Sequence, residues 1–148
     1  MVVVVVSRLL LGTVLALVLT SCYNRGTDTT SVFPIKRGEL WEASISTGDA
    51  AFKTEFELRG APYREDGTEN FSADFRTTNG TKRGSGHVLY RSNLFLTYFW
   101  LSDNQYDFVG CQVQYGQALE RQTVGFSSSK FQGTSQTLKD GCTLTRLR

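Results

Sequence analysis

The sequence predicts an all-β domain: a single small antiparallel meander barrel, lipocalin-like in architecture, or a two-layer β-sandwich, with about seven or eight strands in either case. Three observations favour this fold class. Apolar and polar residues alternate with a period of two in several short segments, whereas no segment keeps a helical period. Glycine and polar turn residues separate these segments at short intervals. Aromatic residues make up 12% of the chain, and only 2 residues are proline.

The first two strands are expected on either side of a Thr47-Gly48-Asp49 turn. Apolar and polar residues alternate over residues 41–46, before the turn. After it the alternation is strict, with a charged residue at every second position from Lys53 to Arg59. Such alternation predicts a strand with one buried and one solvated face. The buried face would carry Phe52, Thr54, Phe56 and Leu58.

The next two strands are expected to form a hairpin around Asn79-Gly80, because this dipeptide readily adopts the positive φ angles of a tight turn. That turn sets the register of the pair. On the inner face, Phe75 would lie opposite Gly84, Ala73 opposite Gly86, and Phe71 opposite Val88. On the outer face, Asp74 would lie opposite Ser85, and Ser72 opposite His87, which is the only histidine.

Residues 94–101 are apolar on both faces, and a turn over Ser102–Gln105 is expected to return the chain into a strand over 106–115. Pairing Leu101 with Tyr106 would set Phe99 opposite Phe108 and Thr97 opposite Gly110. The other face would then gather Leu94, Leu96, Tyr98, Trp100, Val109, Cys111 and Val113. Either a second layer covers this face, which is the favoured interpretation, or it is a binding surface formed by Leu96, Tyr98 and Trp100.

The rest of the chain predicts a segment over 118–126, a serine-rich turn at 127–129, a segment around Phe131, and a final strand over 142–147. Cys111 and Cys142 are expected to form a disulfide, because the export signal described below places the chain in an oxidising compartment and the lipid implied there takes Cys22, which leaves these two as an even pair. The alternative, a metal site, lacks histidine partners and a Cys-x-x-Cys spacing. Closing this loop stabilises a chain by about 3–4 kcal/mol in the chain-entropy model.

An uncharged apolar run from Leu9 to Leu19 follows Arg8, which is the order of an export signal. Leu19-Thr20-Ser21-Cys22, at its end, resembles the lipobox of bacterial lipoproteins, in which the cysteine becomes the lipidated first residue after cleavage. The resemblance implies a signal peptide over 1–21, a lipid on Cys22, and a domain held by its lipid at a membrane of the bacterial cell envelope, facing the periplasm or the exterior. A transmembrane anchor is the alternative, but Ser7 and Arg8 interrupt the apolar stretch.

Behind Cys22, residues 22–38 are expected to form a flexible tether, and residues 39–148 a single β domain. Val32–Ile35 is apolar enough to dock on that domain and shorten the tether. Removing the signal with Arg8 leaves 15 basic and 14 acidic residues, so nothing in the charge favours nucleic-acid binding.

No catalytic residues, metal ligands or cofactor site are assigned. The single histidine, His87, is expected on an open strand face near Ser72 and Asp74, where nucleophilic catalysis would lack oxyanion donors. The sequence therefore favours a non-enzymatic binding domain. One alternative is a carrier of a small hydrophobic ligand in a barrel interior lined by phenylalanines, the candidates being Phe52, Phe56, Phe71, Phe75, Phe99 and Phe108.

Another alternative is a partner or inhibitor of an envelope enzyme such as lysozyme. Ser85-Gly86-His87-Val88-Leu89-Tyr90 is similar to the Ser-Gly-x-x-Tyr motif of the membrane-bound inhibitors of c-type lysozyme, which are small disulfide-containing β-barrel lipoproteins, but it has one more residue before the tyrosine. Because a one-residue shift turns a strand side chain to the other face, no function is transferred on this motif.

Overall fold

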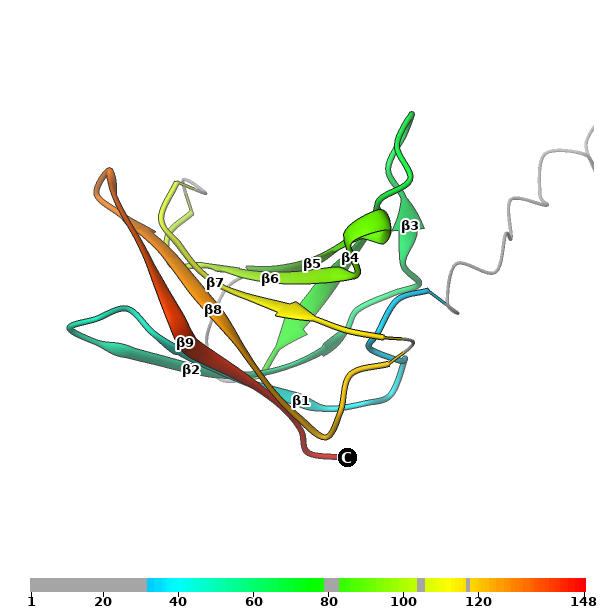
Figure 1. The fold of residues 1–148 in the computed structure, drawn as a ribbon, viewed down its shortest axis with the longest axis horizontal. Helices are drawn as coiled ribbons and strands as arrows, with labels where there is room; N and C mark the ends of the chain where they lie inside the picture. The colour runs from blue at the N-terminus through cyan, green and yellow to red at the C-terminus, as the bar shows by residue number, and fades with distance from the viewer. Residues whose placement is uncertain (1–31, 79–82, 104–105, 117) are drawn as a thin grey trace, which may run out of the picture.

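The computed structural model describes residues 32–78, 83–103, 106–116 and 118–148, and these form an antiparallel β structure (Figure 1). The one helical element in this part of the chain is a short 3₁₀ helix, η2 (Tyr90–Ser92), and no described helix is long and apolar enough to cross a membrane. The strands are β1 (Trp41–Ser46), β2 (Ala51–Leu58), β3 (Tyr63–Arg64), β4 (Phe71–Thr77), β5 (Arg83–Leu89), β6 (Leu94–Trp100), β7 (Phe108–Gln114), β8 (Gln122–Phe131) and β9 (Thr134–Arg146).

The strands close into a barrel in which nearly every strand pairs with its neighbours in sequence. β1 pairs with both β2 and β9, and a β2–β4 pairing completes the ring of eight, with the two-residue β3 added beside β4. The predicted antiparallel meander barrel is therefore confirmed, and the sandwich alternative is not the fold that forms. Closure leaves the eight barrel strands with partners on both sides, which removes the unpaired edges an open sheet would expose.

The predicted register of β4 and β5 is confirmed at every pair, from Phe71 opposite Val88 to Phe75 opposite Gly84. The glycines of β5 are required by the rings that lie against them. A Cβ at Gly86 would lie 2.4 Å from Cζ of Phe75, and a Cβ at Gly84 would lie 2.9 Å from Cδ1 of Phe99. The Asn79-Gly80 turn that predicted the register lies outside the described residues.

The predicted register of β6 and β7 is wrong by one residue. The Leu101 N–H donates to the carbonyl of Asp107 at 2.9 Å, and Trp100 consequently lies opposite Phe108. A shift of one residue exchanges the two faces of a strand. Phe108 therefore points outward instead of lining the interior, whereas three residues predicted for the outer face are buried inside: Val109, Cys111 and Val113.

The sequence predicted a turn at the serine run 127–129, but these residues lie within β8. The chain instead turns at Gln132 and Gly133, whose φ angles are +47° and +83°. These two left-handed residues form the two-residue connection of a β-hairpin. The long hairpin β8–β9 that results crosses the left side of Figure 1 in orange and red.

The predicted disulfide is confirmed: Cys111 of β7 is bonded to Cys142 of β9, with 5.7 Å between their Cα atoms. The two strands flank β8, on which Cys111 faces Ser127 and Cys142 faces Gly125. The bond therefore ties together three neighbouring strands of the barrel wall.

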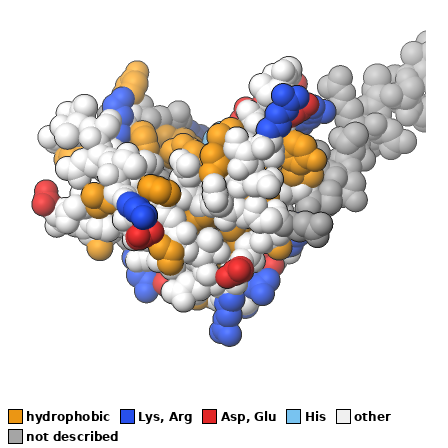
Figure 2. Space-filling view, in the orientation of Figure 1, with side chains coloured by type: hydrophobic (Ala, Val, Ile, Leu, Met, Phe, Trp, Pro, Cys, Tyr) orange, Lys and Arg blue, Asp and Glu red, His pale blue; other side chains and the backbone are white. Residues whose placement is uncertain are grey.

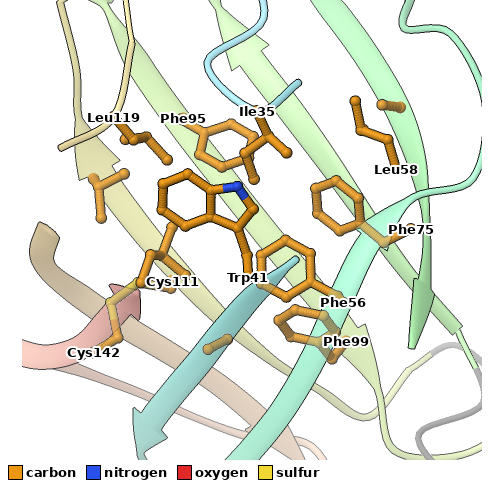
Figure 3. Close-up of a cluster of buried hydrophobic side chains, with 14 of the residues drawn as sticks. Ile35, Trp41, Phe56, Leu58, Phe75, Phe95, Phe99, Cys111, Leu119 and Cys142 are labelled. Carbon is orange, nitrogen blue, oxygen red and sulfur yellow. A yellow bond between two sulfur atoms is a disulfide. The ribbon is translucent and has the colours of Figure 1, made fainter. Parts of the chain in front are cut away.

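Aromatic and aliphatic side chains fill the barrel interior (Figure 3). Of the predicted lining residues, Phe56, Phe75 and Phe99 are buried, while Phe52 and Phe71 are partly buried against them. The rings of Phe56 and Phe75 lie 4.7 Å apart, and those of Phe56 and Phe99 lie 5.3 Å apart. Such close ring packing is typical of a protein core, and the side chains of the barrel itself therefore fill its middle.

The segment before β1 seals one end of this core. Phe33 and Ile35 are almost completely buried, and the ring of Phe33 meets that of Phe95 edge-on at 5.3 Å. The predicted docking of Val32–Ile35 is thus seen in the structure, and the packed unit includes part of the segment expected to be a tether.

Candidate functional site

The outer surface of β6, β7 and β8 carries a patch of large apolar side chains, which we call the outer aromatic face. The register brings the patch together, because Leu96 lies opposite Gln112 and Gln112 opposite Phe126, while Trp100 lies opposite Phe108. The members of the outer aromatic face are Leu96, Tyr98, Trp100, Phe108 and Phe126.

Tyr98 is the centre of the outer aromatic face. Its ring packs edge-on against Phe108 with 5.4 Å between ring centroids, and it lies over Gly110, where a Cβ would come within 3.0 Å of Cδ1. The partial burial of Tyr98 raises the pKa of its phenol, so the hydroxyl remains a neutral donor and acceptor at neutral pH. Leu96, Trp100 and Phe108 are half-buried, and Phe126 is 47% exposed.

The structure thus keeps the predicted trio of Leu96, Tyr98 and Trp100 on one outward-facing surface. The sequence favoured a second layer over this surface, and the described part of the chain does not form one. Sequence reasoning missed the other two members of the face. Phe108 was placed inside because of the register error, and Phe126 was placed just before the supposed serine turn. The alternation of Val124 and Phe126 with the buried Gly125 and Ser127 was the signal that would have found it.

A polar cluster borders the outer aromatic face on β4 and β5. His87 Nδ1 lies 2.8 Å from the hydroxyl of Ser72 and 3.0 Å from Oε1 of Glu65, and the Ser72 hydroxyl itself donates to Glu65. On the other side of the ring, Nε2 lies 3.3 Å from the hydroxyl of Ser85. The Glu65 carboxylate accepts hydrogen bonds, and Ser72 already donates its proton to Glu65. The hydrogen bonds therefore assign the imidazole proton to Nδ1.

The sequence predicted His87 and Ser72 side by side on the outer face, and this is confirmed. It did not predict Glu65, which follows β3 and is brought to the histidine only because β3 pairs with the start of β4. Asp74, the carboxylate expected near His87, lies opposite Ser85 and is not the one that bonds the imidazole.

The cluster and the outer aromatic face are continuous, because the His87 ring meets the Tyr98 ring at 5.9 Å. The connectivity of Ser85, His87 and Glu65 resembles that of a nucleophile, a base and an orienting carboxylate. However, β5 pairs with both β4 and β6, so the sheet ladders use the backbone N–H groups around Ser85 that would have to serve as oxyanion donors. What the cluster offers a partner is a set of fixed hydrogen-bonding groups beside aromatic rings.

The motif that is similar to the lysozyme-inhibitor sequence is divided between two environments. Ser85 is buried and belongs to the polar cluster. Tyr90 lies beyond the end of β5 in η2, where its ring packs against Phe71 at 6.1 Å.

Glu65 makes the stability of the protein sensitive to acid. The pKa of its carboxyl is lowered from the ordinary 4.5, first by the hydrogen bond from Ser72 and then by that with His87. A lowered carboxyl pKa contributes stability that is present above the ordinary pKa and is lost as the pH falls through the folded-state value. Because Glu65 is about a third exposed, we expect Glu65→Gln to lower the free energy of unfolding by about 1 kcal/mol or less at neutral pH.

Urea unfolding of wild type and Glu65→Gln over a series of pH values measures this effect. The difference in the free energy of unfolding between the two proteins should shrink as the pH falls below 4.5. Ser72→Ala removes the largest cause of the lowered pKa of Glu65, so the loss of stability should occur at higher pH in this variant. A difference that is the same at every pH would contradict the assignment.

Comparison of the chain with protein-family models, with curated proteins and with solved structures finds no match. Among the described residues, no group of His, Cys, Asp and Glu side chains is arranged to hold a metal ion. Leu19-Thr20-Ser21-Cys22, the predicted lipidation site, lies outside the described residues.

Proposed function

We propose that this chain is a non-enzymatic, lipid-anchored protein of the bacterial cell envelope, and that its barrel binds a protein partner through the outer aromatic face. The observation that carries the binding role is that this face stays partly open beside a filled core. Phe126 is 47% exposed, and the rings around Tyr98 pack on one another instead of under another layer. Partly exposed apolar patches of this kind on soluble domains are typical of interaction sites.

The composition of the outer aromatic face suits a protein partner. Tryptophan and tyrosine supply much of the binding energy at protein interfaces, and they do so at the centre of a patch surrounded by polar groups. Tyr98 and Trp100 hold such a position, with the polar cluster of His87 next to Tyr98. A ligand carried in the middle of the barrel is less well supported, since phenylalanine rings occupy that space.

The non-enzymatic assignment is supported by the position of the serine and histidine within a fully paired sheet. The anchor is supported by the lipobox-like residues Leu19-Thr20-Ser21-Cys22 behind an apolar run. An attached lipid would hold the barrel at the membrane by way of residues 22–31, which precede the segment that seals its end.

The anchor is tested by Cys22→Ala in the native host. The substitution should leave an uncleaved precursor and abolish labelling with radioactive or alkyne-bearing fatty acid, because the thiol is the acceptor of the lipid. Cys142→Ala is the matched control, since it also removes a cysteine and should keep the label. Continued labelling of the Cys22→Ala protein would show that the lipid is not on this residue.

The binding surface is tested by a photo-crosslinking amino acid placed at Leu96 in cells. We expect one defined crosslinked species from this position and none from Ser44, an exposed residue of β1 on the opposite side of the barrel. Adding Trp100→Ala to the Leu96 probe should lower the crosslink yield several-fold, because an aromatic anchor is lost. Equal crosslinking from Leu96 and Ser44, or a Leu96 crosslink yield that Trp100→Ala leaves unchanged, would refute the proposed surface.

A further inference from the structure

The end of the barrel opposite the sealing segment holds a concavity. Two hairpins whose turns are described, β1–β2 and β8–β9, end there, whereas Phe33 and Ile35 occupy the other end. Figure 1 shows these hairpin tips on the left and the entering chain on the right. Between the hairpins lies a pocket of about 500 Å³, which we call the distal pocket.

The distal pocket has an apolar floor and apolar walls. Val109, which is 2% exposed, belongs to the core and forms its floor. Leu101 and Phe131 line it from the ends of two hairpins and remain 41% and 55% exposed. Figure 2 shows hydrophobic side chains at the upper left, where the β8–β9 hairpin ends. A small apolar ligand buries more apolar surface against large side chains around a concavity than against the same side chains on a convex surface.

The polar groups of the distal pocket lie on its rim. Thr47 and Asp49 come from the β1–β2 turn, and Gln136 comes from β9, with its Oε1 close to Gly48. Asp49 is the charged side chain among the described residues that line the pocket. A second carboxylate stands just behind the rim, because Asp107 accepts a hydrogen bond from the Gln132 N–H at 2.8 Å.

We propose that the distal pocket binds a small amphipathic amine, with its aryl or alkyl part against Leu101 and Phe131 and its ammonium group at Asp49. The negative rim selects against carboxylates and sulfonates of the same shape, because a like charge is repelled where an opposite charge is attracted. The size of the pocket is within the range of small-molecule sites, roughly 300–1,000 Å³.

This site adjoins the proposed protein-binding surface. The two share Phe108, which lines the pocket and also belongs to the outer aromatic face. Asp49 and Phe131 belong to the pocket alone, so substitutions there test the pocket without altering the outer aromatic face. Phe126 supplies a matched control, since it is another exposed phenylalanine of the same strand, β8, that points to the outer face.

The test uses the full lipidated chain in nanodiscs and two fluorinated probes, 4-fluorophenethylamine and the anion 3-(4-fluorophenyl)propionate. Broadening of the fluorine NMR signal of each probe is titrated against protein-loaded nanodiscs, with empty nanodiscs subtracted. We expect the amine to bind at least about tenfold more tightly than the anion. Phe131→Ala should weaken amine binding about tenfold, and Phe126→Ala should leave it unchanged.

Asp49→Asn separates the charge from the shape of the site. It should remove most of the preference for the amine over the anion while leaving the melting temperature unchanged, because Asp49 is exposed in a turn. Equal affinity of wild type for amine and anion, or amine binding that survives Phe131→Ala, would overturn the proposal. These results do not bear on the crosslinking from Leu96, so the two proposals stand or fall separately.

Discussion

Trp41→Ala lowers the free energy of unfolding by about 3–5 kcal/mol, the expected loss when a large buried aromatic side chain leaves a cavity. Trp41 is completely buried at the start of β1, and Figure 3 shows its indole among Ile35, Phe95 and Phe56 in the middle of the core. Its Nε1–H also donates to Oε2 of Glu39 at 3.0 Å, so truncation removes a hydrogen bond as well as packing. Urea unfolding followed by far-ultraviolet circular dichroism measures the change.

The second tryptophan is the matched control for this prediction. Trp100→Ala removes the same side chain from the outer aromatic face, where it is half-buried, and should cost about 1 kcal/mol or less. Trp41→Phe keeps most of the ring volume and should fall between the two, which covers the case in which Trp41→Ala does not fold at all. Equal losses for Trp41→Ala and Trp100→Ala would contradict the arrangement of inner and outer faces.

Removing the disulfide lowers the free energy of unfolding by about 3–4 kcal/mol, as the chain-entropy model gives for cysteines separated by 31 residues. The measured quantity is the shift in the thermal and urea midpoints of Cys142→Ala relative to the oxidised protein. The bond joins the strands on either side of β8, so its loss removes a covalent link across the barrel wall and leaves the β8–β9 hairpin held by its pairing with β7 and β1.

A double-mutant cycle tests whether the loss belongs to the bond. Cys111→Ala, Cys142→Ala and the double variant should be destabilised by nearly the same amount, because each removes the one shared link. Addition of the two single losses in the double variant would mean that each side chain acts through its own packing.

The sequence by itself determined the features that depend on local alternation and turn chemistry. The period-two pattern from Phe52 to Leu58 identified a strand and its buried face. The β4–β5 register followed from an Asn-Gly turn. The disulfide followed from the two cysteines that remain as a pair in an exported chain when Cys22 is assigned to the predicted lipid. In each case the feature is determined either by residues that are close in sequence or by a choice with only one candidate partner.

The tertiary structure alone decided what depends on segments distant in sequence. A one-residue difference in the β6–β7 connection reversed the faces of β7, since only the packing of Val109 and its neighbours inside the barrel selects the register. The serine run became strand because β9 continues to pair with β8 past it. Glu65 reached His87 only through the pairing of β3 with β4. Closure by β2–β4, the seal formed by Phe33, and the distal pocket all depend on contacts between segments that are far apart in sequence or belong to different hairpins. Periodicity within one segment specifies which face of a strand is apolar, but it carries no information about which distant strand will cover that face.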